Sequence, residues 1–399
     1  MHPTLALEFA EDADWLGGAI YLENLLAALS ALPPGQRPTV RLNVLGSPAT
    51  PMAARLRSYP VVAGPSGNTA AGLLRARARR LHRALVRRWP LLGRFSGAPD
   101  TVVYFPAFDA RQSWRRNLYW IPDFQPLHLP ELFTPAELAA RRRSFAEIAA
   151  ARGILLLSSA SALADFHRFY PDARVEPRVW SFCSSIEAGP LAELPALRQR
   201  YGLPEKFLYI ANQFWRHKDH GTAFGALKRL REQGLSVPLV CTGLQSDRRD
   251  AGYFAELMNT LGLHTGQPVQ LLGVIPRADQ IQVLRCAAAV IQPSRFEGWS
   301  TVIEDAKALG RPVIASDIAV HGEQLAGCAG SRLFRTGDAA ALAAAIAELW
   351  PALRPGPDVA GEQRAAARRD ARRLESAAGF LAILDAAAGP PAQSTGRTP

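Results

Sequence analysis

Lysine is scarce in this sequence of 399 residues, which has four lysines among its 46 basic residues. The net charge of +11 is therefore carried almost entirely by arginine, whose guanidinium suits phosphate and carboxylate partners. Long hydrophobic runs are missing too, since no stretch approaches the roughly 20 apolar residues that a membrane-spanning helix needs. The first residues also lack the pattern of a signal peptide. These features favour a basic cytoplasmic protein without a membrane-spanning helix.

Cysteine is rare as well, and the four cysteines are far apart, with no C-x-x-C pair. This spacing argues against a zinc site and against the disulfide framework of a small secreted protein. We expect single thiols in a reducing compartment at Cys183, Cys241, Cys286 and Cys328.

The sequence does contain an alternation of strand-like apolar runs with helix-like segments, which is typical of α/β proteins. A chain of this length, with 48% hydrophobic residues, is too long for one core, so we expect two domains. The expected parts are a first domain at residues 1–190, a linker at 191–204, a second domain at 205–360, a long helix at 361–388 and a disordered tail at 389–399.

In the first half of the chain, short apolar runs bounded by Gly, Pro and Asp predict strands. Thr134 and Glu137 have the spacing of a capping box, and Pro135 suits the first helical position, so a helix should begin there. The expected strands are Thr4–Phe9, Thr39–Leu45, Pro60–Ala63, Thr101–Phe105, Asn117–Ile121, 153–159 and Arg178–Phe182.

The most informative stretch is Ile291–Glu323. It reads as a strand end, a loop containing Glu297 and Gly298, a helix that stops at Gly310, and a second strand. Ligands of such βαβ units bind at the carboxyl ends of the strands, where Glu297 should stand. The loop that feeds the helix, Gly298, Trp299, Ser300 and Thr301, offers free backbone N–H groups that suit a phosphate.

This stretch resembles the C-terminal signature of the retaining family 4 glycosyltransferases, which have the GT-B fold. The matching residues are Pro293, Ser294, Glu297, Gly298, Gly310, Pro312 and Val313. The family's second acid, eight positions after the first, falls on Asp305, and Glu304 stands beside it. The resemblance leaves open which of the two binds the nucleotide ribose.

The segment Asn212–His220 resembles the donor-binding loop of a subset of the same family. Lys218 holds the family's Lys position, Gln213 holds its usual Arg position, and Arg216 is a candidate for the missing charge. The resemblance covers most of Leu208–Leu349. It implies two Rossmann-like domains facing each other across a cleft, with the last helix crossing back to the first domain.

The resemblance also assigns roles. Glu297 would hold sugar hydroxyls, and Lys218 would neutralise the leaving diphosphate. The family often has a His-Asp pair after a first-domain strand. Here Pro122 takes the His place, Asp123 the Asp place, and His128 is a substitute candidate on the acceptor side. Gly17 and Gly18 resemble the Gly pair near the donor's reactive end, although an ordinary tight turn explains them equally well.

Asp12 and Asp14 spell the D-x-D metal motif of the other glycosyltransferase fold. Their place before a Gly pair at the first turn argues against a metal. We therefore expect no metal and no cofactor, with a nucleotide-diphosphate sugar as the substrate.

The segment from Leu73 to Phe95 flanks a leucine stripe with arginines. Such basic amphipathic helices lie on anionic membrane surfaces, but a solvated helix of an arginine-biased protein fits equally well. If this helix binds a membrane, the protein is expected at the inner face of the cytoplasmic membrane. The residues that would contact the membrane or acceptor include Arg79, Arg80, Arg87 and Arg88.

The sequence thus predicts a retaining hexosyltransferase that moves a sugar, such as mannose or a related hexose, to a glycan or lipid-linked acceptor in cell-surface polysaccharide synthesis. One alternative is a nucleotide-sugar 2-epimerase of the same fold, which would need a first-domain histidine and acidic bases. Another is a non-catalytic basic protein that binds membrane or nucleic acid. No recognised nucleic-acid motif supports a nucleic-acid partner.

Overall fold

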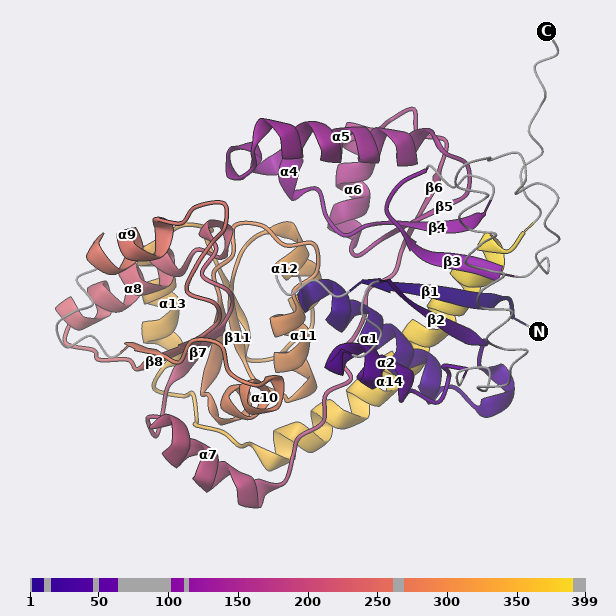
Figure 1. Ribbon diagram of the computed structural model, residues 1–399. Helices are drawn as coiled ribbons and strands as arrows, with labels where there is room; N and C mark the ends of the chain where they lie inside the picture. The colour runs from indigo at the N-terminus through magenta and orange to yellow at the C-terminus, as the bar shows by residue number, and fades with distance from the viewer. Residues whose placement is uncertain are drawn as a thin grey trace, which may run out of the picture.

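The computed structural model describes residues 2–10, 16–45, 50–63, 102–110, 115–260 and 269–389. Two α/β domains lie side by side in Figure 1, the first in indigo and magenta and the second in pink to orange. Each contains a six-stranded sheet in which every pairing is parallel. The expected pair of Rossmann-like domains is confirmed.

In the first domain, apolar side chains of the central strands pack against a helix on one face of the sheet. Leu5 and Leu7 of the first strand are fully buried and join a cluster with Leu25 and Leu29 of the first helix, α1. The strand order is β2 (Val40–Leu45), β1 (Thr4–Ala10), β3 (Val102–Ala107), β4 (Arg116–Ile121), β5 (Ile154–Leu157) and β6 (Glu176–Val179).

The helices of the first domain lie between these strands in the chain. The predicted capping box is present, because Thr134 accepts from the Glu137 N–H while the Glu137 carboxylate accepts from Thr134. The helices are α1 (Leu16–Ala31), α2 (Pro51–Arg57), α4 (Gln125–His128), α5 (Pro135–Ala150) and α6 (Ala160–Phe169), with short 3₁₀ turns at Pro34–Gln36 and Pro130–Leu132.

In the second domain the strand order reverses beside β7, which lies between β8 and β10. Such a switch point is where ligands bind in open parallel sheets. The order is β12 (Arg332–Phe334), β11 (Val313–Ser316), β10 (Ala289–Gln292), β7 (Leu208–Ala211), β8 (Leu239–Thr242) and β9 (Val269–Leu271).

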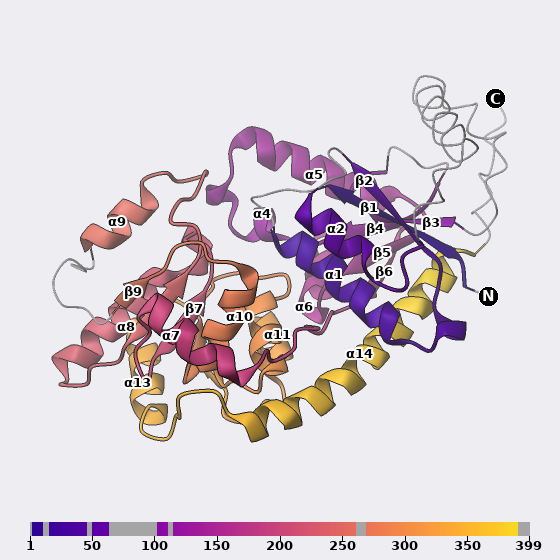
Figure 2. The same cartoon turned by 60° about the horizontal axis from the view of Figure 1, so that its bottom comes forward.

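The second domain's helices cover both faces of this sheet, as the turned view of Figure 2 shows. They are α7 (Leu194–Tyr201), α8 (His220–Glu232), α9 (Tyr253–Thr260), α10 (Arg277–Cys286), α11 (Thr301–Ala308), α12 (Ala319–Leu325) and α13 (Ala339–Leu349), with 3₁₀ turns at Leu191–Glu193 and Arg216–Lys218.

The last helix, α14 (Val359–Ala387), runs from the second domain back along the first, as Figures 1 and 2 show in yellow. A buried ion pair between Arg285 and Glu362 fixes its start to α10. Near its other end, Phe380 lies in the first domain's core, and the Trp180 indole N–H donates to the Ser376 carbonyl. The expected crossing helix is confirmed.

Two expectations about the chain path need correction. The strand expected at Pro60–Ala63 is a single bridge between Val62 and Val40, because the run is too short to extend the ladder at the sheet edge. The segment expected as a linker, 191–204, contains helix α7, whose Leu194 and Leu197 are buried against the second domain. The arginine-rich segment 73–95 and residues 390–399 of the expected tail lie outside the described residues.

Candidate active site

The site lies at the switch point of the second sheet, where β7 and β10 end. Lys218 ends the 3₁₀ turn that follows β7, and Glu297 lies in the loop that follows β10. The Arg295 N–H donates to the His217 carbonyl at 2.8 Å, which joins the two loops. The Lys218 Nζ then lies 2.6 Å from the Glu297 Oε1. The structure therefore brings together the two residues on which the sequence resemblance depends most.

The Lys218–Glu297 pair is sheltered from water, with the side chains 15% and 10% exposed. Burial acts to raise the pKa of Glu297, but Lys218, His321 and a hydrogen bond from Ser294 together hold this pKa below its usual value. Glu297 is therefore ionised at neutral pH, and its oxygens can accept hydrogen bonds from hydroxyl groups.

Two buried side-chain amides, joined by hydrogen bonds, hold the carboxylate of Glu297. The Gln292 Nε2 donates to the Glu297 Oε1 at 2.8 Å, and the Gln292 Oε1 accepts from the Asn212 Nδ2 at 2.9 Å. Asn212 directly follows β7 and Gln292 is the last residue of β10, and both side chains are buried. Neither residue was predicted as part of the site. The available signal was a polar residue at the end of each buried strand.

His321, in α12, is a further buried residue near Glu297. Its Nδ1 lies 3.0 Å from the Ser316 carbonyl oxygen and must donate to it, since a carbonyl only accepts. Burial lowers the pKa of His321 to about 4, against the opposing effects of Glu297 and Ser316. His321 is therefore neutral at physiological pH, and Lys218 is the cation in contact with Glu297.

The loop after Glu297 packs closely against the first domain. A Cβ at Gly298 would overlap the Pro122 carbonyl oxygen and come within 2.9 Å of the Asp123 Cβ. Next to it, the Trp299 indole N–H donates to the Phe182 carbonyl at 2.9 Å. Only glycine permits this approach, which brings the end of β4 to the donor-side loop.

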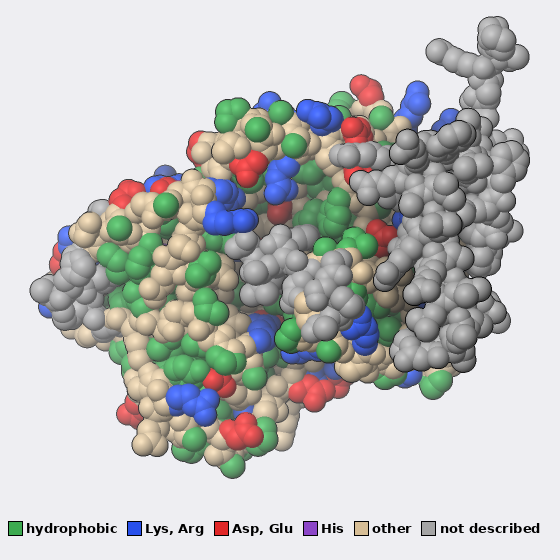
Figure 3. Space-filling view, viewed as in Figure 1, with side chains coloured by type: hydrophobic (Ala, Val, Ile, Leu, Met, Phe, Trp, Pro, Cys, Tyr) green, Lys and Arg blue, Asp and Glu red, His purple; other side chains and the backbone are tan. Residues whose placement is uncertain are grey.

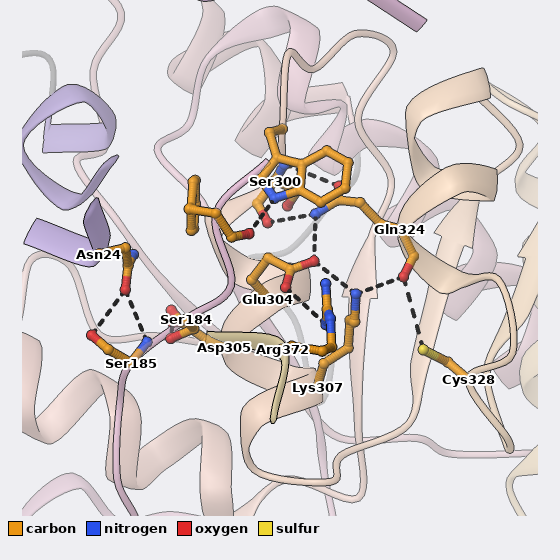
Figure 4. A network of polar contacts seen from close by, with 12 residues as sticks. Asn24, Ser184, Ser185, Ser300, Glu304, Asp305, Lys307, Gln324, Cys328 and Arg372 are labelled. Atoms are coloured by element: carbon orange, nitrogen blue, oxygen red, sulfur yellow. Dashed lines mark hydrogen bonds and ion pairs between the residues drawn. The ribbon is translucent and has the colours of Figure 1, made fainter. Parts of the chain in front are cut away.

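The helix turn expected to bind phosphate is hydrogen-bonded to the side chain of Gln324 (Figure 4). The Ser300 N–H donates to the Gln324 Oε1, and the Gln324 Nε2 donates back to the Ser300 carbonyl, both at 3.0 Å. The expectation of a free N–H group at Ser300 is therefore wrong. Among the described residues, the N–H groups of Gly298, Trp299 and Thr301 have no partner within the protein and remain for a ligand.

Glu304 and Asp305 point in different directions from α11, as Figure 4 shows. Glu304 is turned toward Gln324 of α12 and Arg372 of α14, and it also pairs with Lys307 of its own helix. Asp305 accepts from the Ser184 Oγ at 2.7 Å, and its other oxygen pairs with Arg277. Asp305 therefore faces the connection between the domains and the start of α10, whereas Glu304 belongs to the contact with α14.

The first domain contributes Asp123 and His128. Asp123 accepts from the Gln125 N–H at 2.9 Å, and burial together with Glu297 raises the pKa of this carboxyl despite Gln125 and Arg141. The His128 Nε2 lies 2.8 Å from the Asp165 Oδ2. Its ring centroid lies 5.1 Å from that of Phe296, so His128 stands at the domain boundary.

Several predicted donor residues lie apart from this centre. The Gln213 Oε1 accepts from the Leu244 N–H, and Arg216 pairs with Asp250 and Glu256 beside α9. Gly17 and Gly18 form the first turn of α1. Asp12, Asp14, Arg79, Arg80, Arg87 and Arg88 lie outside the described residues.

Further contacts close the boundary between the domains. The Glu323 carboxylate of α12 accepts from the N–H groups of Ala160 and Ser161 at the start of α6. Arg249 places its guanidinium over the rings of Trp215 and Phe133, which come from different domains. In Figure 3, basic side chains gather where the α4–α5 region meets the second domain. None of these contacts has a signal in the local sequence.

The comparisons with known proteins agree with this geometry. The family model described as Glycosyl transferases group 1 matches residues 204–351, the region that contains Lys218, Glu297 and Asp305. Residues 204–351 are therefore similar in sequence to this family. No curated protein sequence matches the chain.

Solved structures of glycosyltransferases share the whole fold. HepE of Anabaena in complex with UDP and glucose has a TM-score of 0.61 at 17% identity, covering 96% of this chain and 97% of its own. Sucrose-phosphate synthase of Thermosynechococcus elongatus has a TM-score of 0.59 at 18% identity, with 96% of each chain covered. WaaG, a glycosyltransferase involved in lipopolysaccharide biosynthesis, has a TM-score of 0.55 at 14% identity, covering 96% and 98%. The GT-B fold of this chain is thereby confirmed.

No group of three or more His, Cys, Asp and Glu side chains is arranged to hold a metal ion within the described ranges. No helix in this part of the chain has the length and apolar character to cross a bilayer.

Proposed function

We propose that this glycosyltransferase moves a hexosyl group, with retention of configuration, from a nucleoside-diphosphate sugar to a glycan or lipid-linked acceptor. The observation that carries the proposal is the sheltered Lys218–Glu297 pair at the switch point, directly before a helix turn with free N–H groups. One cation, one carboxylate and a phosphate-binding turn are the groups that a sugar diphosphate requires.

The donor would lie along the carboxyl end of the second sheet. Its diphosphate would contact Lys218 and the N–H groups of Gly298, Trp299 and Thr301, and its sugar hydroxyls would donate to Glu297. Asp305 is the better candidate for the ribose, because its position beside Ser184 and Arg277 separates it from the α14 contact that engages Glu304. A carboxylate has about four acceptor sites, so these two partners do not use all the acceptor capacity of Asp305.

The reaction would break the bond between the sugar C1 and the phosphate oxygen, and the electron pair would leave with the diphosphate. The acceptor oxygen would bond to C1 on the same face, and its proton would pass to the departing phosphate oxygen. Lys218 and the turn would stabilise the charge that grows on the diphosphate. Asp123, held against Gly298, would orient the acceptor hydroxyl, with no metal ion required.

UDP-sugars are the first donors to test, since similar folds are described in complex with UDP and glucose or with UDP-glucose. Thermal unfolding with a panel of UDP-, GDP- and ADP-sugars should show a shift only for the true donor, because ligand binding to the native state raises its stability. Slow donor hydrolysis should accompany the shift and persist with EDTA. Absence of any shift and any hydrolysis would contradict the proposal, and release of a 2-epimer would favour the epimerase.

For the acceptor we propose a lipid-linked glycan at an anionic cytoplasmic membrane surface, in cell-surface polysaccharide synthesis. The support is the arginine-rich segment at 73–95, together with the fold shared with a protein of lipopolysaccharide biosynthesis. Each arginine near an anionic leaflet contributes about 1 kcal/mol. Flotation should recover the protein with anionic vesicles but not neutral ones, and changing Arg79, Arg80, Arg87 and Arg88 to Gln should abolish recovery. Equal recovery on both vesicle types would exclude this surface.

A further inference from the structure

Gln292 occupies a central position that the proposed reaction does not yet use. Its side chain is fully buried at the end of β10, where its Nε2 donates to the Glu297 Oε1 at 2.8 Å and to the Ser294 Oγ at 3.1 Å. Its Oε1 accepts from the Asn212 Nδ2 at 2.9 Å. Every hydrogen-bonding atom of this amide therefore has a partner near the reacting groups.

The orientation of this amide follows from the charge of Glu297. A carboxylate offers only acceptors, so Gln292 must present its NH₂ group to Glu297 and its carbonyl to Asn212. Asn212, 4% exposed, must in turn donate its NH₂ group. The chain from Asn212 through Gln292 thus has one direction, and it ends on the carboxylate.

Glu297 has two strong donors on the same oxygen, the Lys218 Nζ and the Gln292 Nε2. Lys218 has a second role in the proposed reaction, because its ammonium must also approach the leaving diphosphate. As Lys218 turns to the phosphate, Glu297 loses part of its counter-charge at the step in which it must accept sugar hydroxyls. Gln292 is neutral and cannot be drawn to the phosphate in the same way.

We propose that Gln292 is a positioning residue that keeps Glu297 charged and aimed at the donor sugar while Lys218 turns to the diphosphate. This inference rests on the proposed function. The groups that face Glu297 are Lys218 after β7, His321 of α12 and Asp123 of the first domain. Lys218 stabilises the carboxylate, neutral His321 adds little charge at pH 7, and Asp123 opposes it. Gln292 and Ser294 then supply the hydrogen bonds from uncharged groups.

The decisive variant is Gln292→Met, which keeps the volume and removes both donor and acceptor. Loss of a hydrogen bond to the charged form raises a carboxyl pKa. We expect the acidic limb of the pH profile of donor hydrolysis to move up by about one pH unit, with kcat lowered about tenfold and KM changed much less. Gln292→Glu should move the limb further, because a second carboxylate would face Glu297.

Asn212→Ser provides a milder variant if Gln292→Met does not fold. It leaves Gln292 in place but removes the donor that fixes its carbonyl, so the limb should move in the same direction by less. Tyr201→Phe is the matched control, since it removes a 2.6 Å hydrogen bond to a different carboxylate, Asp279, outside the site. It should lower the melting temperature slightly and leave the limb unchanged.

A second readout does not need turnover. The carboxyl ¹³C signal of Glu297, assigned by its loss in Glu297→Gln, reports the pKa directly in the intact protein. The pKa should be higher in Gln292→Met than in wild type, and the difference should grow when UDP is added. Equal pKa values would overturn the inference even if hydrolysis is observed. If no nucleotide sugar is hydrolysed but the pKa values differ, the proposed function fails and the support of Glu297 by Gln292 stands.

Discussion

At the residue scale, the site depends on one close ion pair. Lys218 lies 2.6 Å from Glu297, and no other described Lys or Arg side chain forms an ion pair with Glu297. In the proposed reaction, this single lysine beside a phosphate-binding turn must therefore serve both the carboxylate and the diphosphate. Replacement of either partner tests this double role.

Lys218→Ala should reduce donor turnover by about 10²–10³, since losing one stabiliser of a developing anion has an effect of that size. Glu297→Gln should cause a similar loss, because it keeps the shape and removes the charge. Steady-state rates with the true donor would measure both, and circular dichroism would verify the fold. Near-normal turnover of Lys218→Ala would exclude the phosphate role.

The adjacent acids Glu304 and Asp305 should respond differently to loss of charge. Asp305→Asn should weaken donor binding about 10–100-fold, because hydrogen bonds to charged groups contribute about 1.5–3 kcal/mol. Glu304→Gln should leave donor affinity unchanged and lower the melting temperature, since its partners are Lys307 and Arg372. Calorimetric titration of the donor compares the two. Weaker donor binding in Glu304→Gln alone would show that Glu304, and not Asp305, binds the ribose.

At the element scale, the start of α6 is occupied by a carboxylate from the other domain. Glu323 accepts from the N–H groups of Ala160 and Ser161, which places a negative charge at the positive end of a helix dipole. Glu323→Gln should speed hydrogen exchange at these two amides and loosen the domain contact. Glu137→Gln at the start of α5 is the control, because its partner lies within the first domain. Unchanged exchange in Glu323→Gln would show that this contact does not persist in solution.

The helix α8 begins at His220, whose imidazole ring is buried and packs as an apolar group. It stacks on Phe214 with centroids 4.0 Å apart, and neither ring nitrogen has a partner among the described residues. Burial lowers the pKa of His220 from 6.5 to about 3. Because the folded-state pKa is depressed, the native state favours the neutral ring. The contribution of the neutral His220 ring to the free energy of unfolding is fully present above pH 6.5 and declines as the pH falls toward 3.

His220→Phe should therefore match wild type at pH 8 and exceed its stability by about 2 kcal/mol at pH 5. Denaturant unfolding at the two pH values measures the difference, and the other buried histidines cancel because both proteins contain them. A constant difference between pH 8 and pH 5 would contradict neutral burial of this ring.

Most elements were predictable because their signals are local. Apolar runs bounded by turn residues predicted the strands, and Thr134 with Glu137 predicted the start of α5. Helix α7 was missed although Leu194 and Leu197 have helical spacing and Gly202 ends it in the left-handed region. The site was predictable only where a motif marks it.

The supporting contacts of the site lacked such a signal, because their partners are distant in the sequence. Gln292 meets Asn212 from 80 residues away, and Asp305 meets Ser184 from 121 residues away. The sequence could not separate Glu304 from Asp305 either. Neighbouring residues on a helix point about 100° apart, and only the packing decides which one faces the site.

At the scale of the whole molecule, α14 is the connection that holds the two domains in one arrangement. Its start is fixed by Glu362, which accepts two hydrogen bonds from Arg285 at 2.7 and 2.8 Å with both side chains buried. Its later turns pack into the first domain's core through Phe380 and Leu384. Between them, Arg372 contacts Glu304 of α11. Loss of the first anchor should therefore affect both stability and domain arrangement.

Glu362→Ala should lower the free energy of unfolding by about 3–5 kcal/mol, because removing one partner of a buried ion pair leaves the other charge uncompensated. Asp370→Ala is the control on the same helix, since the Asp370 carboxylate is 59% exposed and water screens its pairs with Arg369 and Arg373. Denaturant unfolding measures both. Small-angle scattering should show an expanded particle for Glu362→Ala alone, because the helix start is then free to leave α10. Equal stability of the two variants would mean that only the first-domain end of α14 holds this helix in place. The arrangement of the domains would then depend on direct contacts, such as those of Gly298 with Pro122 and of Glu323 with α6.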